Sequence, residues 1–207
     1  MKRRRSERGT LTIEAVMVVA FLLTFSLASL DLGTAWRASL GISNAVRSGA
    51  RVGSAAGVSS NADYQILLSL GSALGRNSVS EVERVVIFKA TSTSTVPSGC
   101  LSASAKTTGG SSGNHCNVYS SSDLAAVLAS PSTVPAEFQG ACPGTGTRWD
   151  RFWCPSSRIN SVGVGGAGPD YIGVYLNVNH ATSTKLFGSS IDIDDTFVMR
   201  IEPQAGS

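Results

Sequence analysis

The sequence predicts an α+β protein with a long N-terminal transmembrane and stem helix, a small antiparallel sheet head and a disulfide-stapled loop insertion. Three observations lead to this fold class. An apolar run from Leu11 to Leu32 directly follows a basic leader. Three strand-like segments occur at 84–90, 171–179 and 196–202. Between the first and second of them lies a Ser/Gly-rich stretch that contains all four cysteines.

Composition and charge exclude one large class of function. Charged residues make up 15% of the chain and aromatic residues 7%, which predicts a thin core with long polar loops. The formal net charge is +3, but the leader at 1–9 contributes +4 by itself, from five basic residues and Glu7, so the rest of the chain sums to −1. Without a basic surplus outside the leader, nucleic acid is not an expected partner.

The apolar run is long enough to cross a lipid bilayer. Its 22 residues reach about 33 Å as a helix, against a hydrocarbon core of about 30 Å. The basic residues before it predict a cytoplasmic N-terminus and an extracytoplasmic head. We therefore expect a single-pass protein of the cell (plasma or inner) membrane. A secretory signal peptide has a similar pattern and is the alternative interpretation.

Glu14 is an acidic residue within the apolar run. A carboxylate at full membrane depth costs about 2.5–3.5 kcal/mol, so either it reaches the cytoplasmic surface or it has a partner. If the chain were cut after Gly9, Thr10 would carry a free ammonium and Glu14 would become the fifth residue. The carboxylate could then pair with the ammonium of a neighbouring subunit and fix the register between subunits.

These features resemble a known family. A basic leader that ends in Gly9, with Glu14 at the head of an apolar helix, resembles a class III (type IV-like) prepilin signal. The segments that follow, DLG at 31–33, NAVRSGAR at 44–51 and FVMRIEP at 197–203, resemble TadE-like pseudopilins, the minor subunits of tight-adherence (Flp) pilus systems. Two departures from the family pattern are Ala15, in place of an aromatic residue, and Ala20, in place of a helix-kinking proline.

The resemblance implies a function in assembly and no catalysis. It implies cleavage by a prepilin peptidase between Gly9 and Thr10, with Glu14 as the register charge among packed helices. The expected partners are the membrane, other pilin subunits and pilus assembly proteins, and no cofactor is expected. The function implied is that of a non-catalytic minor pilin in the assembly or surface display of a type IV-like pilus or a related secretion machinery. Two alternatives remain: a static membrane-anchored extracytoplasmic binding protein whose cysteine-rich insertion recognises a ligand, and a secreted domain.

Five segments follow from these patterns: a leader (1–9), a transmembrane helix (10–32), a stem helix with a second helix and first strand (33–90), the insertion (91–170) and a C-terminal strand pair (171–207). The stem helix should continue to about Ser54, with one apolar stripe formed by Trp36, Leu40, Val46 and Ala50. A second helix is expected from Asn61 or Ala62 to Leu74, with Gly75 as its stop.

The strand-like segments predict a three-stranded antiparallel sheet packed on the stem helix. The segment 84–90, with the sequence RVVIFKA, is continuous and rich in β-branched residues. The segment 171–179 alternates and places one apolar face on Ile172, Val174, Leu176 and Val178. The segment 196–202 should bury Phe197, Met199 and Ile201. Asp192, Asp194 and Asp195 precede it and are expected in a solvated turn rather than in a calcium site.

The insertion contains Cys100, Cys116, Cys142 and Cys154. In an extracytoplasmic, loop-rich segment they predict two disulfides. Three pairings are possible, and the nearest pairs, Cys100–Cys116 and Cys142–Cys154, close the shortest loops. A zinc site with His115 is the competing interpretation, but no two cysteines have the short spacing of zinc ligands. A short helix is expected at Ser122–Ala129, capped by Ser122 or Asp123.

Other motifs in the second half of the chain indicate no enzymatic site. GVGGAG at 163–168 matches a dinucleotide fingerprint in letters but lacks the surrounding strand and helix, so a loop is expected. TSTK at 182–185 lacks the partner motifs of a serine acyl enzyme. No metal site is predicted.

The densest aromatic patch of the chain lies just before Cys154. It has two interpretations, a local core under the second disulfide or an exposed interface contact, since Trp and Arg are common in interface hot spots. Its residues are Arg148, Trp149, Arg151, Phe152 and Trp153.

Overall fold

The computed structural model describes residues 4–75, 78–91, 95–142, 147–161, 168–185 and 188–203, with side chains from Thr12 onward. The chain divides into two compact units. The N-terminal unit comprises Met1–Ala38 with His180–Ile191, and the head unit comprises Ser39–Asn179 with Asp192–Ser207.

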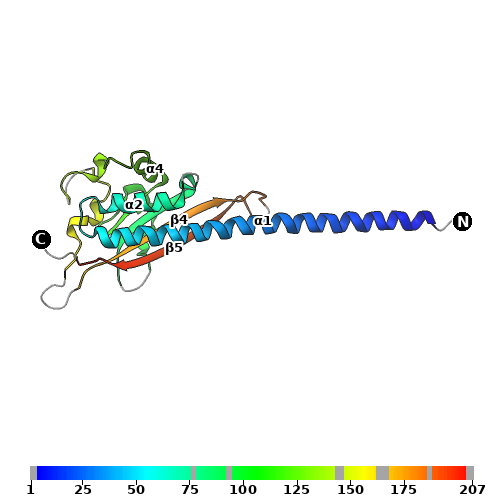
Figure 1. Ribbon diagram of the computed structural model, residues 1–207, viewed down its shortest axis with the longest axis horizontal. Coiled ribbons are helices and arrows are strands. Elements are labelled where there is room, and N and C mark those ends of the chain that lie inside the picture. The colour runs from blue at the N-terminus through cyan, green and yellow to red at the C-terminus, as the bar shows by residue number, and fades with distance from the viewer. Residues whose placement is uncertain are drawn as a thin grey trace. The chain divides into compact units, whose positions relative to one another are not determined.

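Two helices confirm the sequence prediction for the first third of the chain. Helix α1 runs without interruption from Arg4 to Ala56, 53 residues (Figure 1). Helix α2 spans Ala62–Leu74 and stops at Gly75, whose φ of 78° lies in the region that favours glycine. Its N-cap is Asn61, so the predicted bounds are confirmed.

The sheet is antiparallel, as expected, but it has five strands among the described residues rather than three. Their order is β2-β3-β1-β4-β5, and their bounds are β1 Val82–Ala90, β2 Gly110–Ser111, β3 Cys116–Tyr119, β4 Tyr171–Ala181 and β5 Ser190–Arg200. The two additional strands come from the insertion. They are only two and four residues long, too short for a recognisable alternation, and β3 is held in place by its pairing with β1.

The centre of β1, residues 85–88, is buried on both faces, which explains its run of four apolar residues. Its partners on β4 include Leu176 opposite Val85 and Val174 opposite Ile87, which confirms the predicted pairing across the insertion. All four of these side chains belong to the larger core, with Ile172 and Val178. Val86 and Phe88 point to the opposite face and belong to a second core.

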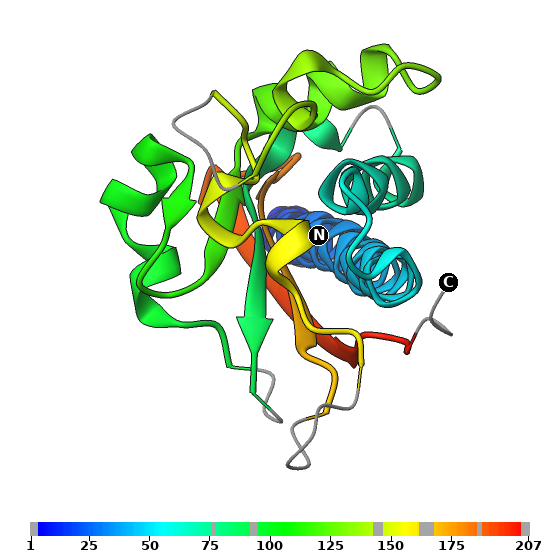
Figure 2. The same ribbon diagram turned by 90° about the vertical axis from the view of Figure 1, so that its left-hand side faces the viewer.

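Helices cover both faces of the sheet in the head unit (Figure 2). The part of α1 from Ser39 onward and α2 lie on one face, over the larger core. On the other face lie the 3₁₀ helix η2 (Ser98–Leu101) and helix α3 (Ala103–Thr108), over the second core. The two covering helices α1 and α2 approach closely at Gly49, where a Cβ atom would lie only 3.3 Å from Ile66 Cγ2.

The predicted apolar stripe on the stem helix is half wrong. Val46 and Ala50 are fully buried, but Leu40 is 53% and Trp36 70% exposed. In the head unit the buried stripe contains Ile42, Ala45, Val46 and Ala50. At 100° per residue, Leu40 lies about 200° around the helix from Ile42, on the opposite side.

The insertion is more ordered than expected. Helix α4 spans Ser121–Ala129, close to the predicted range, but its N-cap is Ser120, which forms a capping box with Asp123. Four short 3₁₀ helices complete the described elements: η1 Val79–Glu81, η3 Ala136–Phe138, η4 Arg151–Trp153 and η5 Pro155–Ser157.

The predicted turn before the last strand is also wrong. Asp192, Asp194 and Asp195 lie within β5, which begins at Ser190. The alternation continues upstream of the predicted start, because Ile193 packs against the core between exposed Asp192 and Asp194. Phe197 and Met199 are half-buried against the same core, and Ile201, just after the strand, is fully buried.

Candidate functional site

The N-terminal unit contains an apolar helix whose side chains are exposed. The large apolar side chains between Ile13 and Leu32 are 45–70% exposed and point in every direction around α1. Among the described residues, α1 is the one helix that is long and apolar enough to cross a membrane. An exposed apolar surface of this size is typical of segments that contact lipid or other apolar helices.

The hydroxyl side chains between Thr24 and Ser29 form hydrogen bonds within the helix. The Ser26 hydroxyl donates to the Leu22 carbonyl at 2.7 Å, and the Ser29 hydroxyl donates to the Phe25 carbonyl at 2.9 Å. Thr24 donates to carbonyls of the preceding turn in the same way. These bonds leave no hydroxyl proton unpaired at these positions, which is the condition for placing them in hydrocarbon.

The predicted processing and register residues all lie on α1. Gly9 and Thr10 are in its first turns, where the structure describes the backbone alone. Glu14 follows and its side chain is exposed, like the apolar residues around it. The helix therefore presents a single carboxylate at the start of an exposed apolar surface, since the described side chains from Ala15 to Leu30 carry no charge.

Asp31 closes the apolar segment and is buried in a set of hydrogen bonds. Its Oδ1 accepts from the backbone amides of Ser183 at 3.0 Å and Thr184 at 3.1 Å, and its Oδ2 accepts from the Thr184 hydroxyl. These donors belong to the connection between β4 and β5. Asp31 is the first residue of the DLG segment at 31–33, but no local pattern assigns it a partner, because Ser183 is 152 residues away in the chain.

Both disulfides have the pairing that the sequence favoured. Cys100 of η2 is bonded to Cys116 at the start of β3, with their Cα atoms 6.1 Å apart. Cys142 is bonded to Cys154, which follows η4, with a Cα separation of 5.8 Å. A zinc site is thus excluded for these cysteines, and the described residues contain no group of His, Cys, Asp or Glu that could hold a metal ion.

The aromatic patch before Cys154 forms core rather than an exposed contact at two of its five residues. Arg148 and Trp153 are buried, at 4% exposure each, which corrects the interface interpretation for them. Arg151, Phe152 and Trp149 are half-buried. The Trp149 ring packs edge-on against Phe138, with centroids 5.5 Å apart. Arg148 and Trp153 are buried because the nearby Cys142–Cys154 disulfide holds this segment against the rest of the head.

The head unit also contains a buried charged network that no sequence pattern predicts. The Asp63 carboxylate in the first turn of α2 accepts from the Arg158 guanidinium, the Tyr119 hydroxyl and the Asn117 side-chain amide. The Arg158 guanidinium also stacks over the Trp153 ring at 4.2 Å. Burial, with the nearby charges of Asp63 and Asp150, raises the pKa of Tyr119 well above 10. No motif marks this network, because its members come from distant parts of the sequence.

A second buried ion pair lies beside the first. Arg148 binds Asp150 through two hydrogen bonds, of 2.7 and 2.6 Å, and donates to the carbonyls of Gly140 and Ser60. Burial raises the pKa of Asp150 although Arg148 pairs with it. Arg148 thereby ties the insertion to the loop before α2.

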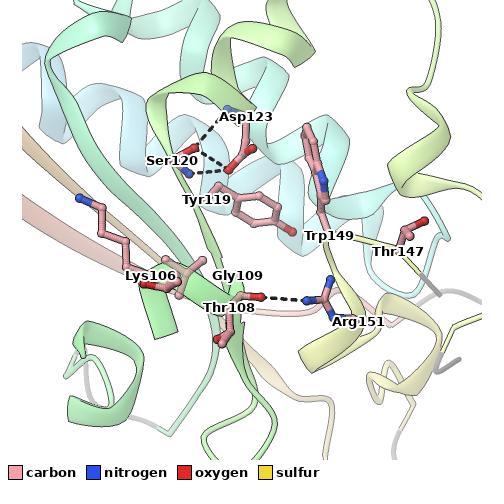
Figure 3. A pocket seen from close by; sticks show the side chains of 11 residues that line it. Lys106, Thr108, Gly109, Tyr119, Ser120, Asp123, Thr147, Trp149 and Arg151 are labelled. Atoms are coloured by element: carbon pink, nitrogen blue, oxygen red, sulfur yellow. Dashed lines mark hydrogen bonds between the residues drawn. The ribbon is translucent and has the colours of Figure 1, made fainter. Parts of the chain in front are cut away.

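The head unit also contains an open pocket of about 630 Å³ between α3, β3 and the segment 147–151 (Figure 3). Trp149, Lys106 and Arg151 are among its lining side chains. Its polar groups already serve the fold: Asp123 caps α4, and Arg151 donates to the Thr108 carbonyl at 2.8 Å. Neither histidine of the chain lines the pocket, and the Ser120 hydroxyl, which donates to the Asp123 carboxylate at 2.7 Å, belongs to the capping box of α4.

The GVGGAG segment at 163–168 lies between η5 and β4 along the sequence, and the TSTK segment at 182–185 lies between β4 and β5. Of 163–168, all but Gly168 lies outside the described residues. Thr182, Ser183 and Thr184 lie in the connection that binds Asp31. No known protein family, curated protein or solved structure matches this chain.

Proposed function

We propose that this protein is a TadE-like minor pilin or pseudopilin that takes part in the assembly or surface display of a type IV-like (Tad/Flp) pilus or a related secretion machinery. The observation that carries the proposal is the helical surface between Ile13 and Leu32, apolar and exposed in every direction, with Glu14 near its start. The motif resemblance at Gly9, Glu14 and 31–33 supports the same conclusion.

A pilin helix must satisfy two environments. While the protein waits in the membrane, its apolar side chains contact lipid. After assembly, the same side chains contact the helices of neighbouring subunits. A surface helix of a globular protein would instead bury one apolar stripe and expose polar residues on its other side. The exposed apolar surface of α1 suits both environments of a pilin.

Glu14 adds specificity to this nonspecific apolar contact. A carboxylate inside an apolar bundle is unfavourable without a partner, and the ammonium created at Thr10 of an adjacent subunit supplies one. Only one axial offset between two helices brings the two charges together. In the proposed function, the carboxylate therefore selects the register and the apolar surface provides the contact area.

The head suits an extracytoplasmic location. It contains two disulfides, which persist in oxidising compartments and are rare in the cytosol. The proposed arrangement places the leader in the cytoplasm, α1 across the membrane and the head outside. Prepilin peptidase, other pilins and assembly proteins are then the proposed partners.

Mass spectrometry of the natural N-terminus tests the proposal. A chain that starts at Thr10 is the expected product of prepilin peptidase. An intact leader would favour the static membrane-anchored binding protein, for which the open pocket beside Trp149 is the supporting observation. A chain that starts beyond residue 28 would indicate a secreted domain and would refute the pilin proposal.

A further inference from the structure

The N-terminal unit carries three exposed side chains just beyond the apolar segment. Trp36 is 70% exposed, and Arg37 and Lys185 are exposed as well. Trp36 and Arg37 are on α1, while Lys185 lies in the β4–β5 connection. Tryptophan and basic residues are the side chains that favour the lipid head-group region.

The axial level of Trp36 matches that region. A hydrocarbon core of about 30 Å that begins at Leu11 ends near Leu30. Trp36 follows six residues later, about 9 Å further along α1. The head-group layer adds about 5–7 Å on each side of the core, and helical side chains lean toward the N-terminus. The indole ring therefore reaches back into the head-group layer.

Asp31 holds the connection that carries Lys185 at the end of the apolar segment. It lies one residue past Leu30, and its carboxylate binds the amides of Ser183 and Thr184, at 3.0 and 3.1 Å. Lys185 is the next residue and has a φ of 60°, in a connection that is tied at the end of the apolar segment. The bound carboxylate of Asp31 is buried, so Arg37 and Lys185 are the exposed charges here.

The three side chains are distributed around the helix. Relative to Asp31 and its bound connection, Trp36 lies about 140° around α1 and Arg37 about 240°, at 100° per residue. Together they leave no wide sector of the helix without a head-group-binding side chain. This distribution distinguishes them from a one-sided contact with a partner protein, which would place them on a single face.

We propose that Trp36, Arg37 and Lys185 form an interfacial collar that binds anionic phospholipid head groups of the outer leaflet and sets the depth of the chain in the membrane. In the collar, Trp36 anchors in the head-group layer while Arg37 and Lys185 bind lipid phosphates. Asp31 positions Lys185 by holding the β4–β5 connection. The proposal rests on the membrane-spanning part of the proposed function and is independent of pilus assembly.

Brominated lipids test the collar on the full chain reconstituted into phosphatidylcholine vesicles. Bromine quenches tryptophan only at close range, and the difference between wild type and Trp36→Phe isolates the signal of Trp36. We expect stronger quenching by lipid brominated near the carbonyl than by lipid brominated near the chain end. Equal quenching by both, or none, would overturn the assigned depth and with it the collar.

A second arm replaces part of the lipid with brominated phosphatidylglycerol, which measures the preference for anionic lipid around Trp36. Arg37→Gln and Lys185→Gln should each reduce that preference about fivefold. Arg51→Gln is the matched control, because Arg51 is also exposed on α1 but lies several turns further along, and it should leave the preference unchanged. An unchanged preference in all three variants would overturn lipid binding by the collar.

Reconstitution itself separates the two proposals. A chain that does not enter vesicles would refute the membrane helix and therefore the proposed function. A chain that enters vesicles but shows no quenching at Trp36 would refute the collar alone, with Trp36 left as a contact for solvent or for another protein.

Discussion

The Arg158 guanidinium donates to the Asp63 carboxylate inside the head unit, where both side chains are fully buried. The pair joins the first turn of α2 to the segment after η5, far apart in sequence. Two further groups of Arg158, Nε and Nη1, are buried without a hydrogen-bond partner, so Asp63 is the main compensation for its charge. The stability of the folded head therefore depends on the Asp63 carboxylate.

Asp63→Asn should lower the free energy of unfolding of the head by about 3–5 kcal/mol, because it leaves a buried guanidinium without its counter-charge. Urea denaturation followed by tryptophan fluorescence measures the loss. Lys106→Gln is the control: it breaks the exposed pair with Glu83 and should cost less than about 1 kcal/mol. Equal losses in the two variants would contradict the assigned role.

Tyr119→Phe should reduce the sensitivity of the head to alkali. Burial raises the pKa of Tyr119 above its unfolded value of about 10, so above this pH the unfolded chain loses the proton before the folded one. Stability contributed by the protonated phenol thus falls as pH rises above about 10, by up to about 1.4 kcal/mol per pH unit.

The measurement is the free energy of unfolding of wild type and Tyr119→Phe at pH 8 and pH 11. At pH 8 the variant should be less stable, by about 1.5–3 kcal/mol for the hydrogen bond to charged Asp63. By pH 11 the difference should shrink. A constant difference would mean that Tyr119 titrates alike in both states.

Removal of one disulfide, as Cys142→Ser with Cys154→Ser, should destabilise the head by about 3 kcal/mol through the regained entropy of the unfolded loop. A reducing agent breaks only the remaining Cys100–Cys116 bridge in the variant but both bridges in wild type. It should therefore lower the free energy of unfolding of the variant by about half as much as that of wild type. Equal losses on reduction would show that the second bridge contributes nothing. Urea denaturation with and without reductant gives both values.

Gly173→Ala and Gly41→Ala should have opposite effects. A Cβ at Gly173 would lie 2.3 Å from Cζ of the fully buried Phe88 ring, so the substitution should cost about 1–3 kcal/mol. At Gly41, in α1, a Cβ meets nothing within 4 Å, and alanine should stabilise the helix by about 0.5–1 kcal/mol. Thermal unfolding of both variants checks the sign; a stabilising Gly173→Ala would contradict the packing.

Glu14→Ala should leave membrane insertion intact and reduce incorporation into fibres about tenfold or more, through loss of the proposed register charge. Immunoblots of the membrane fraction and of sheared fibres measure both quantities. Met17→Ala, an uncharged change on the same exposed surface, is the control and should be incorporated nearly like wild type. Equal incorporation of the Glu14→Ala form would remove the register role.

Elements that depend on local pattern could be predicted from the sequence. The apolar run set α1, Gly75 set the end of α2, the alternation at Ile172, Val174 and Leu176 set the buried face of β4, and short loops favoured the observed disulfides. Each of these depends on residues close together along the chain, where periodicity and loop entropy act.

The remaining features come from the tertiary structure. It added β2 and β3 to the sheet, buried Arg148 and Trp153, exposed Trp36 and Leu40, and joined Asp63 to Arg158 and Asp31 to Thr184. These outcomes depend on partners far away in sequence. Whether a polar side chain is buried depends on which counter-charge the fold brings to it, and no local pattern contains that information.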